Sequence, residues 1–264
     1  MIEQFKNAMR NHGIEPPEYI VADGQIHRVK KSVWYVFHDD WGVFGDWKYD
    51  IKQSWHPEKG YKTPSPEDRK QRQDQSDRLK ELEKTKQDEA MRRAQNIYSE
   101  SYPASPNHPY LIKKGILPLV AKQANGRLII PIQDINSQLV NLQFISNDGE
   151  KRFLKGGLKK GCFCSLGEFS TETFLICEGF ATGASLQREF NRRTIVAFDA
   201  GNLLPVAQNI RQIHPDAKII ICADNDVSGV GQKAAFKASA AVHAQVLIPY
   251  TPGNDWNDEL ISEI

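Results

Sequence analysis

Four carboxylates stand just after short apolar runs in the C-terminal third of this 264-residue chain, at Glu178, Asp199, Asp224 and Asp226. Carboxylates that lie close together raise one another's pKa unless a cation neutralises them. Oxygen ligands without histidine or cysteine favour Mg²⁺ or Mn²⁺ over softer metals. Taken singly, each residue could equally form a turn or cap a helix. Three separate runs that end in acidic residues indicate a site for a divalent cation.

The apolar runs are predicted to be strands of one parallel sheet. They are rich in β-branched residues and alternate with amphipathic segments of helix length, which is typical of α/β domains with helices on both faces of the sheet. We expect strands at residues 173–177, 194–198, 218–222 and 245–248, with helices at 181–191, 203–213 and 229–243. Because ligands gather at the carboxyl ends of parallel strands, the four carboxylates are expected to meet at one edge.

Basic side chains dominate the segment before this sheet. Residues 101–169 carry 9 basic and 4 acidic side chains and residues 170–264 carry 7 and 11, so the net charge of +1 hides a cationic part beside an anionic one. Glycines among the lysines would let this segment approach phosphates closely, although taken alone it could also be an ordinary solvated loop. Arg127 is the favoured contact because its planar guanidinium suits phosphate. The candidate nucleotide and DNA contacts are Arg127, Lys151, Arg152, Lys155 and Lys159.

Aromatic residues concentrate near the N-terminus, where residues 1–60 hold four of the five tryptophans. Strand-like runs at 33–37 and 41–47 predict a small β-rich module. Its rings could stack on unpaired bases. They could instead form the module's own core, and we prefer this interpretation because a domain of that size without a metal or a disulfide needs many apolar side chains.

Four segments follow from these patterns: an aromatic β-rich module at 1–60, a charged helical spacer at 61–100, a basic α+β subdomain at 101–169 and the parallel-sheet domain at 170–264. The spacer lacks glycine and proline between 67 and 98 and has few apolar residues, which predicts a solvated helix. In the basic subdomain, the runs 128–132 and 139–145 predict an antiparallel pair. Since no apolar run approaches 18 residues and no signal peptide is recognisable, we expect a cytoplasmic protein without a membrane span.

The acidic strand ends also form recognisable motifs. They are Cys177-Glu178-Gly179, Asp199-Ala200-Gly201, Asp224-Asn225-Asp226 and, near the C-terminus, Asp255-Trp256-Asn257-Asp258. Upstream stand His108-Pro109-Tyr110-Leu111 and Lys151-Arg152-Phe153. In combination these motifs resemble the Toprim primases of phages and conjugative plasmids over residues 105–262. The resemblance implies a Toprim domain preceded by the basic subdomain of that family.

Carried over by position, the resemblance implies that Glu178 is a metal ligand or a general acid and base. It implies that Asp224 and Asp226 bind Mg²⁺ or Mn²⁺. Many replicative primases have a further aspartate where this chain has Thr182, which leaves the number of metals open. No four-ligand spacing of cysteine and histidine exists, so no zinc is expected. The second-rank acidic candidates are Asp199, Asp258 and Asp255, of which the last reads equally well as the cap of a short helix.

The function that the resemblance implies is that of a DNA primase, a DNA-directed RNA polymerase that makes short RNA primers on single-stranded DNA by Mg²⁺-dependent nucleotidyl transfer. Its partners would be the single-stranded template and ribonucleoside triphosphates. The sequence contains no P-loop for a helicase motor, so a separate replicative helicase is a further expected partner. Two alternatives use the same residues: a Toprim nuclease, in which water replaces the 3′-hydroxyl, and a non-catalytic nucleic-acid-binding accessory protein of replication.

Overall fold

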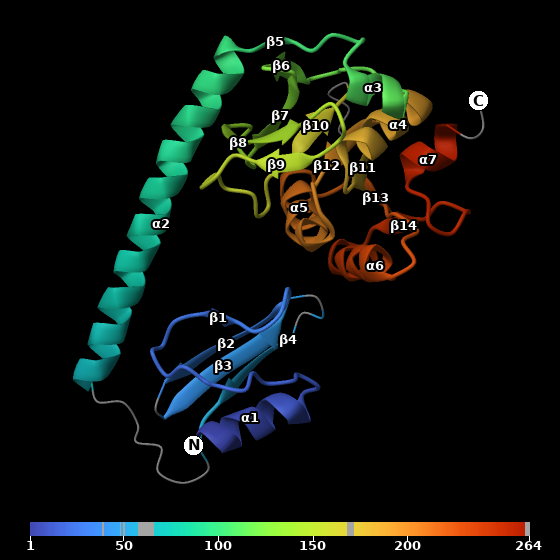
Figure 1. The fold of residues 1–264 in the computed structure, drawn as a ribbon. Helices are drawn as coiled ribbons and strands as arrows, with labels where there is room; N and C mark the ends of the chain where they lie inside the picture. Colours follow the sequence, from blue (N-terminus) through green and yellow to red (C-terminus); the bar gives the residue numbers. More distant parts are fainter. Residues whose placement is uncertain (39, 48, 50, 58–65, 168–171, 262–264) are drawn as a thin grey trace. The chain divides into compact units, whose positions relative to one another are not determined.

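The computed structural model describes all residues except 39, 48, 50, 58–65, 168–171 and 262–264 (Figure 1). Two compact units are present, Met1–Ser76 and Asp77–Ile264. The expected boundaries at 60/61 and 169/170 fall among residues outside the described set. Within that set, no helix combines the length and the apolar character needed to cross a membrane.

The first unit contains an antiparallel sheet with one helix packed on it. The strands lie in the order β1-β2-β3-β4, and their bounds are His27–Arg28, Val33–His38, Trp41–Asp46 and Ile51–Trp55. The β2–β3 hairpin is the one expected from residues 33–47. Phe5 and Met9, one turn apart on α1 (Ile2–Asn11), are fully buried against the sheet. A Cβ atom at Gly42 would lie 2.4 Å from the Phe5 ring, so this glycine lets the helix approach.

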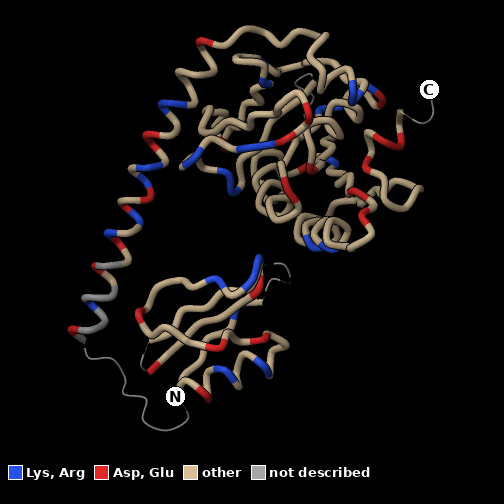
Figure 2. The backbone as a smooth tube through the Cα atoms, viewed as in Figure 1, with Lys and Arg blue, Asp and Glu red and all other residues tan. Residues whose placement is uncertain are grey.

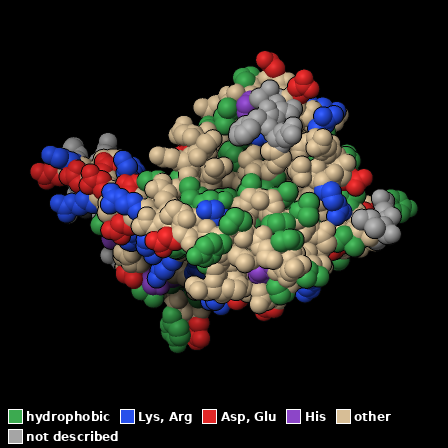
Figure 3. Space-filling view, turned by 90° about the horizontal axis from the view of Figure 1, so that it is seen from above, with side chains coloured by type: hydrophobic (Ala, Val, Ile, Leu, Met, Phe, Trp, Pro, Cys, Tyr) green, Lys and Arg blue, Asp and Glu red, His purple; other side chains and the backbone are tan. Residues whose placement is uncertain are grey.

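The long helix α2, Pro66–Glu100, corresponds to the charged helix expected at 67–98. Acidic and basic residues follow one another along it (Figures 2 and 3). Its C-terminal part belongs to the second unit, where Ala94 is fully buried with Ile129 and Leu142. A few apolar residues therefore anchor the C-terminal part of a helix whose other described side chains are mostly exposed.

The second unit begins with a five-stranded antiparallel sheet in the order β5-β6-β7-β8-β9. Its strands are Tyr102–Pro103, Lys122–Ala124, Arg127–Gln133, Leu139–Ile145 and Lys151–Phe153, and the helix α3, Pro109–Lys114, precedes β6. β7 and β8 are the antiparallel pair predicted at 128–132 and 139–145. Because side chains alternate along a strand, Leu128 and Ile145 face one core while Ile129 and Leu142 face α2.

A mainly parallel five-stranded sheet follows, in the order β10-β12-β11-β13-β14. The strands are Cys164–Leu166 (β10), Thr173–Cys177 (β11), Arg193–Val196 (β12), Lys218–Cys222 (β13) and Gln245–Leu247 (β14). The helices are Phe180–Phe190 (α4), Ala200–Ile213 (α5), Val230–Val242 (α6) and Trp256–Ile261 (α7). The predicted parallel sheet with flanking helices is confirmed. β10 was not predicted, and it pairs antiparallel with β12 at the sheet edge.

Different elements pack on the two faces of this sheet. On one face, Ile176 packs with residues of α5 and α6, among them Leu203 and Ala235. On the other face, Cys177 packs with Phe180 of α4 and with the core that includes Leu128 of β7. The antiparallel and parallel sheets thus share one hydrophobic core, which holds β9 near the carboxyl ends of the parallel strands.

Candidate functional site

Carboxylates converge at the carboxyl ends of the parallel strands. The register pairs Cys177 of β11 with Val196 of β12 and with Cys222 of β13, so the segments after these strands leave the sheet at one edge. Glu178 directly follows β11, and Asp224 lies two residues beyond β13. Glu178 Oε1 and Asp224 Oδ1 are buried, and within the described part of the chain neither accepts a hydrogen bond. Two buried acceptors without donors form a site that a cation would satisfy.

Gly231, at the start of α6, keeps the space beside these carboxylates open. A Cβ atom there would lie 2.8 Å from Asp226 Oδ2, 3.0 Å from Glu178 Oε1 and 3.7 Å from the backbone oxygen of Asp224. The Gly231 N–H donates to Asp226 Oδ2 over 2.8 Å, and the Ser228 hydroxyl donates to Asp226 Oδ1. Oxygens of all three acidic residues therefore face one point.

Burial and repulsion disfavour the ionised forms of two of these carboxyls. Desolvation, and then the charges of Asp224 and other nearby aspartates, raise the pKa of Glu178 to about 7. Desolvation and then Asp255 raise the pKa of Asp224 to about 6, while Lys151 acts in the opposite direction. A cation bound here would lower both pKa values by stabilising the carboxylates.

Asp226 differs because its carboxylate accepts several hydrogen bonds. Desolvation raises its pKa, but hydrogen bonds from the Ser228 hydroxyl and from the backbone of Gly231, Val230 and Gly229 outweigh that effect and leave the pKa below its ordinary value. Among the described residues, no three His, Cys, Asp or Glu side chains are already arranged to hold a metal ion. The donors fit a hard divalent cation in chemistry, and side-chain movement would be needed to close the coordination.

The second-rank aspartates have structural partners. Asp199 Oδ1 accepts a hydrogen bond of 3.0 Å from a backbone N–H in the first turn of α5, and Asp199 Oδ2 pairs with Lys159 Nζ. Asp255 Oδ1 accepts one of 2.9 Å from the Asp258 N–H at the start of α7. Lys114 Nζ lies 3.0 Å from Asp258 Oδ1 and 3.9 Å from Asp255 Oδ2. These residues act as caps and ion-pair partners, and Asp199 and Asp255 also act on the centre through their charge.

Strand alternation separates the candidate cations of β9. Lys151 lies on the sheet face that shares a core with β11, and its Nζ is 4.0 Å from the position that a Cβ of Gly179 would take. Desolvation lowers the pKa of Lys151, and the charge of Asp255 opposes that shift. Arg152 lies on the opposite face, towards α2, and pairs with the exposed Glu150 over 2.7 Å.

The remaining candidate cations also lie on two different sides, one near the carboxylates and two near α2. Lys159 reaches the centre through its pairing with the α5 cap, and its Nζ stands 5.0 Å over the Phe153 ring. The carbonyl oxygen of Lys155 accepts a hydrogen bond of 2.7 Å from Arg93 of α2, which places its loop against that helix. Arg127 is exposed at the start of β7, on the face that packs on α2. The structure thus brings Lys151 and Lys159 to the carboxylates and leaves Arg127, Arg152 and Lys155 on the α2 side.

Two residues that sequence reasoning missed shape this centre, Gly231 and Asn202. The Asn202 side chain is buried and accepts a hydrogen bond of 2.7 Å from the Gly161 N–H. It donates to the carbonyl oxygens of Cys162 and Ala197 over 2.9 and 2.8 Å, which ties the loop carrying Lys159 to the parallel sheet. A glycine inside an expected helix was the available signal for Gly231. Asn202 reads in sequence as an ordinary residue of a helix start.

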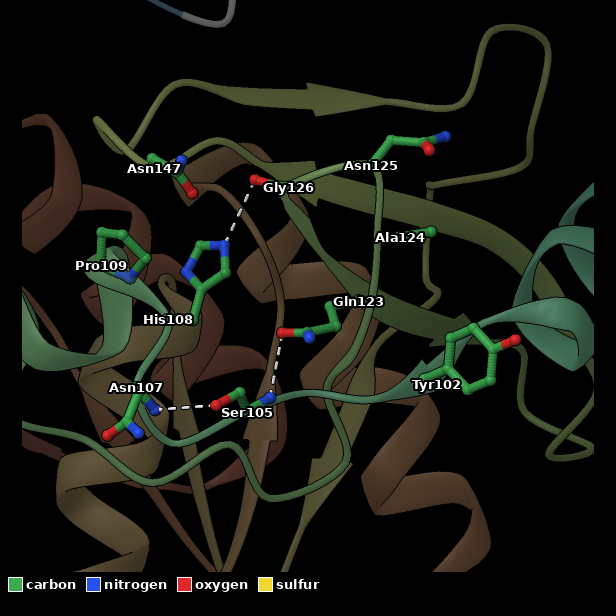
Figure 4. Close-up of a pocket in the computed structure, with 10 residues that line it drawn as sticks. All are labelled: Tyr102, Ser105, Asn107, His108, Pro109, Gln123, Ala124, Asn125, Gly126 and Asn147. Atoms are coloured by element: carbon green, nitrogen blue, oxygen red, sulfur yellow. Dashed lines mark hydrogen bonds between the residues drawn. The ribbon is translucent and has the colours of Figure 1, made fainter.

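A hollow of about 510 Å³ lies between the segment before α3 and the β6–β7 hairpin, and none of the predicted site residues lines it (Figure 4). Neutral side chains such as Asn107 and Gln123 form much of its wall. His108 in that wall is already bonded, since Nδ1 accepts from the Tyr110 N–H over 3.3 Å and Nε2 faces the Gly126 carbonyl oxygen at 3.4 Å. With no carboxylate, ammonium or guanidinium group among its described lining residues, this hollow is not the acidic centre.

Comparison with known proteins agrees with this geometry. Residues 173–263 match the family model of the Toprim domain. The chain is 29% identical to an Escherichia coli protein named DNA primase TraC, in an alignment of 289 positions that covers 96% of this chain and 27% of the relative. A second E. coli protein of that name is 29% identical over 280 positions, covering 94% of this chain and 19% of the relative. This chain therefore spans about a quarter and a fifth of the length of these relatives.

Solved structures show a similar fold. The structure of the DnaG primase catalytic domain bound to ssDNA matches with a TM-score of 0.50 and 12% identity, over 68% of this chain and 76% of that chain. At this identity the likeness concerns the fold alone. The Toprim resemblance predicted from the acidic motifs is confirmed by the family match.

Proposed function

Residues 173–263 form a Toprim domain, and from that premise we propose that this chain is the primer-synthesising core of a plasmid-type DNA primase. It would join ribonucleotides on a single-stranded DNA template. Both E. coli relatives are named DNA primases, and the alignments take in the antiparallel sheet as well as the Toprim domain. The site that supports this activity is the acidic edge with its two neighbouring lysines.

Nucleotidyl transfer joins a 3′-oxygen to the α-phosphorus of a nucleoside triphosphate, and pyrophosphate leaves. Held by Glu178, Asp224 and Asp226, Mg²⁺ or Mn²⁺ would supply Lewis-acid neutralisation of the phosphate charge. Lys151 and Lys159 would bind phosphate oxygens from the side of the antiparallel sheet. Glu178 is proposed either as a ligand or as the general base, and without a cation on it a pKa of about 7 suits it to accept the proton of the 3′-hydroxyl near neutral pH.

One observation carries the proposal, the pair of buried oxygens without donors at Glu178 Oε1 and Asp224 Oδ1. Carboxylates with a purely structural role are hydrogen-bonded, as the caps Asp199 and Asp255 are. Leaving these two buried carboxylate oxygens without donors is costly unless a cation binds them. The space that Gly231 leaves open beside them supports the same conclusion.

The direct test incubates the full chain with single-stranded DNA, labelled ribonucleoside triphosphates and Mg²⁺. We expect short RNA products, and we expect Asp224→Asn/Asp226→Asn to reduce them by about 100-fold or more, because charge stabilisation of the transition state is lost. Asp216→Asn, at an exposed aspartate outside the site, is the matched control and should prime normally. Priming by the double variant at the control rate would refute the proposal.

The same reactions separate the two alternatives. Shortened DNA that disappears in the double variant would identify a nuclease, in which water takes the place of the 3′-hydroxyl. If wild type forms neither product and its DNA binding survives the double substitution, the chain is an accessory nucleic-acid-binding protein.

The proposed partners follow from the reaction. They are the single-stranded template, ribonucleoside triphosphates and, because the template must be unwound, a replicative helicase that acts with the chain. The proposed place of action is the cytoplasm, where plasmid DNA is replicated.

A further inference from the structure

Strand alternation divides the aromatic residues of the first unit between two faces of its sheet. Tyr35 and Phe37 of β2 and Phe44 of β3 point towards α1 and form the core with Phe5. Figure 1 shows α1 on this face of the sheet. The core therefore uses only some of the aromatic residues that the sequence concentrates here.

The opposite face carries a second aromatic group. Trp34 of β2 stacks on Trp47, which follows β3, with ring centroids 5.7 Å apart and an interplanar angle of 22°. The Arg28 guanidinium, on the cross-strand neighbour of Trp34, lies 5.0 Å from the centre of the Trp47 ring. Further along this face, His38 stacks on Trp41 at 6.1 Å. Trp47 is half exposed, so the outer part of this stack reaches solvent.

This second face is cationic and hollowed. Arg28 and Lys52 lie on it in exposed positions, and none of its described strand positions carries a carboxylate. In the turn after β2, the Asp40 carboxylate lies 3.8 Å from His38 Nδ1. A hollow of about 360 Å³, lined by Trp41, Gly42, Val43, Ser54 and His56, opens at β3 and β4. A flat aromatic surface with cations around it complements a chain whose bases have planar faces and whose backbone is anionic.

We propose that this face, defined by Arg28, Trp34, Trp41, Trp47 and Lys52, binds single-stranded nucleic acid by stacking unpaired bases on Trp41 and Trp47 and by pairing phosphates with its cations. Trp34 is buried and supports the Trp47 ring by stacking on it. The inference rests on the proposed function for the identity of the strand, which is the primase template. It does not depend on catalysis. The first unit thereby holds template for the chemistry of the second.

The test uses the full chain in EDTA and measures anisotropy of a fluorescein-labelled twelve-nucleotide oligo(dT). Trp47→Ala is expected to weaken binding by about tenfold, which is within the range for loss of one stacked base. Tyr19→Ala is the matched control, because Tyr19 is an exposed aromatic residue of the same unit that lies outside the strands, and it should bind normally. Quenching of tryptophan fluorescence by unlabelled oligo(dT) should fall in Trp47→Ala.

A second variant keeps the inference testable if Trp47→Ala fails to fold. Lys52→Gln keeps all the rings and is expected to lower the slope of log affinity against log salt by about 0.7, the effect of one lost phosphate contact on a single strand. An abasic oligonucleotide of the same length should bind wild type at least as weakly as oligo(dT) binds Trp47→Ala, because it loses every stacked base. Equal binding of oligo(dT) by wild type and Trp47→Ala, or equal binding of abasic and normal strands, would overturn the inference.

Failure of the proposed function would look different. Asp216→Asn, at an exposed aspartate of the second unit outside the acidic centre, should bind oligo(dT) as wild type does. Absence of priming together with a Trp47-dependent anisotropy change would refute the primase and keep this inference. Priming by wild type, together with no effect of Trp47→Ala on oligo(dT) binding, would refute this inference and keep the primase.

Discussion

Glu178→Gln is expected to stabilise the chain at pH 8 when divalent cations are absent. Burial and neighbouring aspartates raise the pKa of Glu178 from 4.5 to about 7. A carboxyl with a higher pKa in the folded than in the unfolded state holds its proton more tightly when folded, so its ionisation destabilises the fold. This destabilisation is absent below about pH 4.5 and complete above about pH 7. Glutamine keeps the shape of the side chain and cannot ionise.

The size of the effect follows from the pKa. A rise from 4.5 to about 7 corresponds to about 3 kcal/mol at most, because one pKa unit equals about 1.4 kcal/mol. For a folding unit of this size that is a rise in Tm of about 5 to 10 °C. The gain should shrink towards zero as the pH falls to 5. Added Mg²⁺ should raise the Tm of wild type more than that of the variant, because a cation stabilises the ionised carboxylate.

Thermal unfolding followed by circular dichroism, in EDTA and in Mg²⁺ at pH 5 and pH 8, measures both effects. Glu189→Gln, at an exposed position of α4, is the matched control and should unfold like wild type throughout. A Tm of Glu178→Gln at or below that of wild type at pH 8 in EDTA would refute the reasoning. An equal Mg²⁺ response in the two proteins would refute the assignment of Glu178 as a ligand.

Three further predictions test the surroundings of the centre. Gly231→Ala should fold, because alanine favours a helix, yet its Cβ would meet two carboxylate oxygens; the Mg²⁺-induced rise in Tm should be lost, and a wild-type response would contradict this. Lys151→Gln should lower kcat/KM for the ribonucleoside triphosphate by about tenfold. Arg152→Gln, on the opposite face of β9, should keep kcat/KM within about twofold of the wild-type value. Similar losses of kcat/KM in both variants would be inconsistent with the alternation of side chains along β9. Asn202→Ala should reduce the free energy of unfolding in urea by about 3 kcal/mol, since it leaves a buried N–H and several carbonyl oxygens without partners. A loss below about 1 kcal/mol would count against the role of Asn202 in tying the Lys159 loop to the parallel sheet.

Local sequence patterns were sufficient to predict the strands and helices of the parallel-sheet domain and its acidic edge. Runs of β-branched residues separated by amphipathic segments predicted β11, β12, β13 and β14 with their helices, because strand and helix periodicity are properties of neighbouring residues. The rule that parallel strands share a carboxyl edge then predicted that Glu178 and Asp224 lie together. β10, Cys164–Leu166, escaped prediction because it stands outside the regular alternation of strands and helices that begins at β11.

Tertiary structure decided which cations meet the carboxylates. Lys151 and Arg152 are adjacent and chemically alike in sequence, but β9 sends them to opposite faces of its sheet. Only the pairing of β9 with β8, and the packing of that sheet on the Toprim domain, directs Lys151 to the centre and Arg152 to α2. Arg127, the favoured phosphate contact from sequence, also lies on the α2 side.

The sequence by itself determined the β2–β3 and β7–β8 pairs, the helix α2, the strands β11 to β14 with helices α4 to α6, and the acidic residues at the strand ends. These features depend on side-chain types at short spacing. It could not determine the role of the N-terminal aromatics, for which a core and a stacking surface had seemed alternatives. Strand register in the folded sheet turns Phe37 and Phe44 towards α1 and Trp34 and Trp41 to the opposite face. Register depends on pairing between distant segments, so only the tertiary structure decides which face each ring occupies.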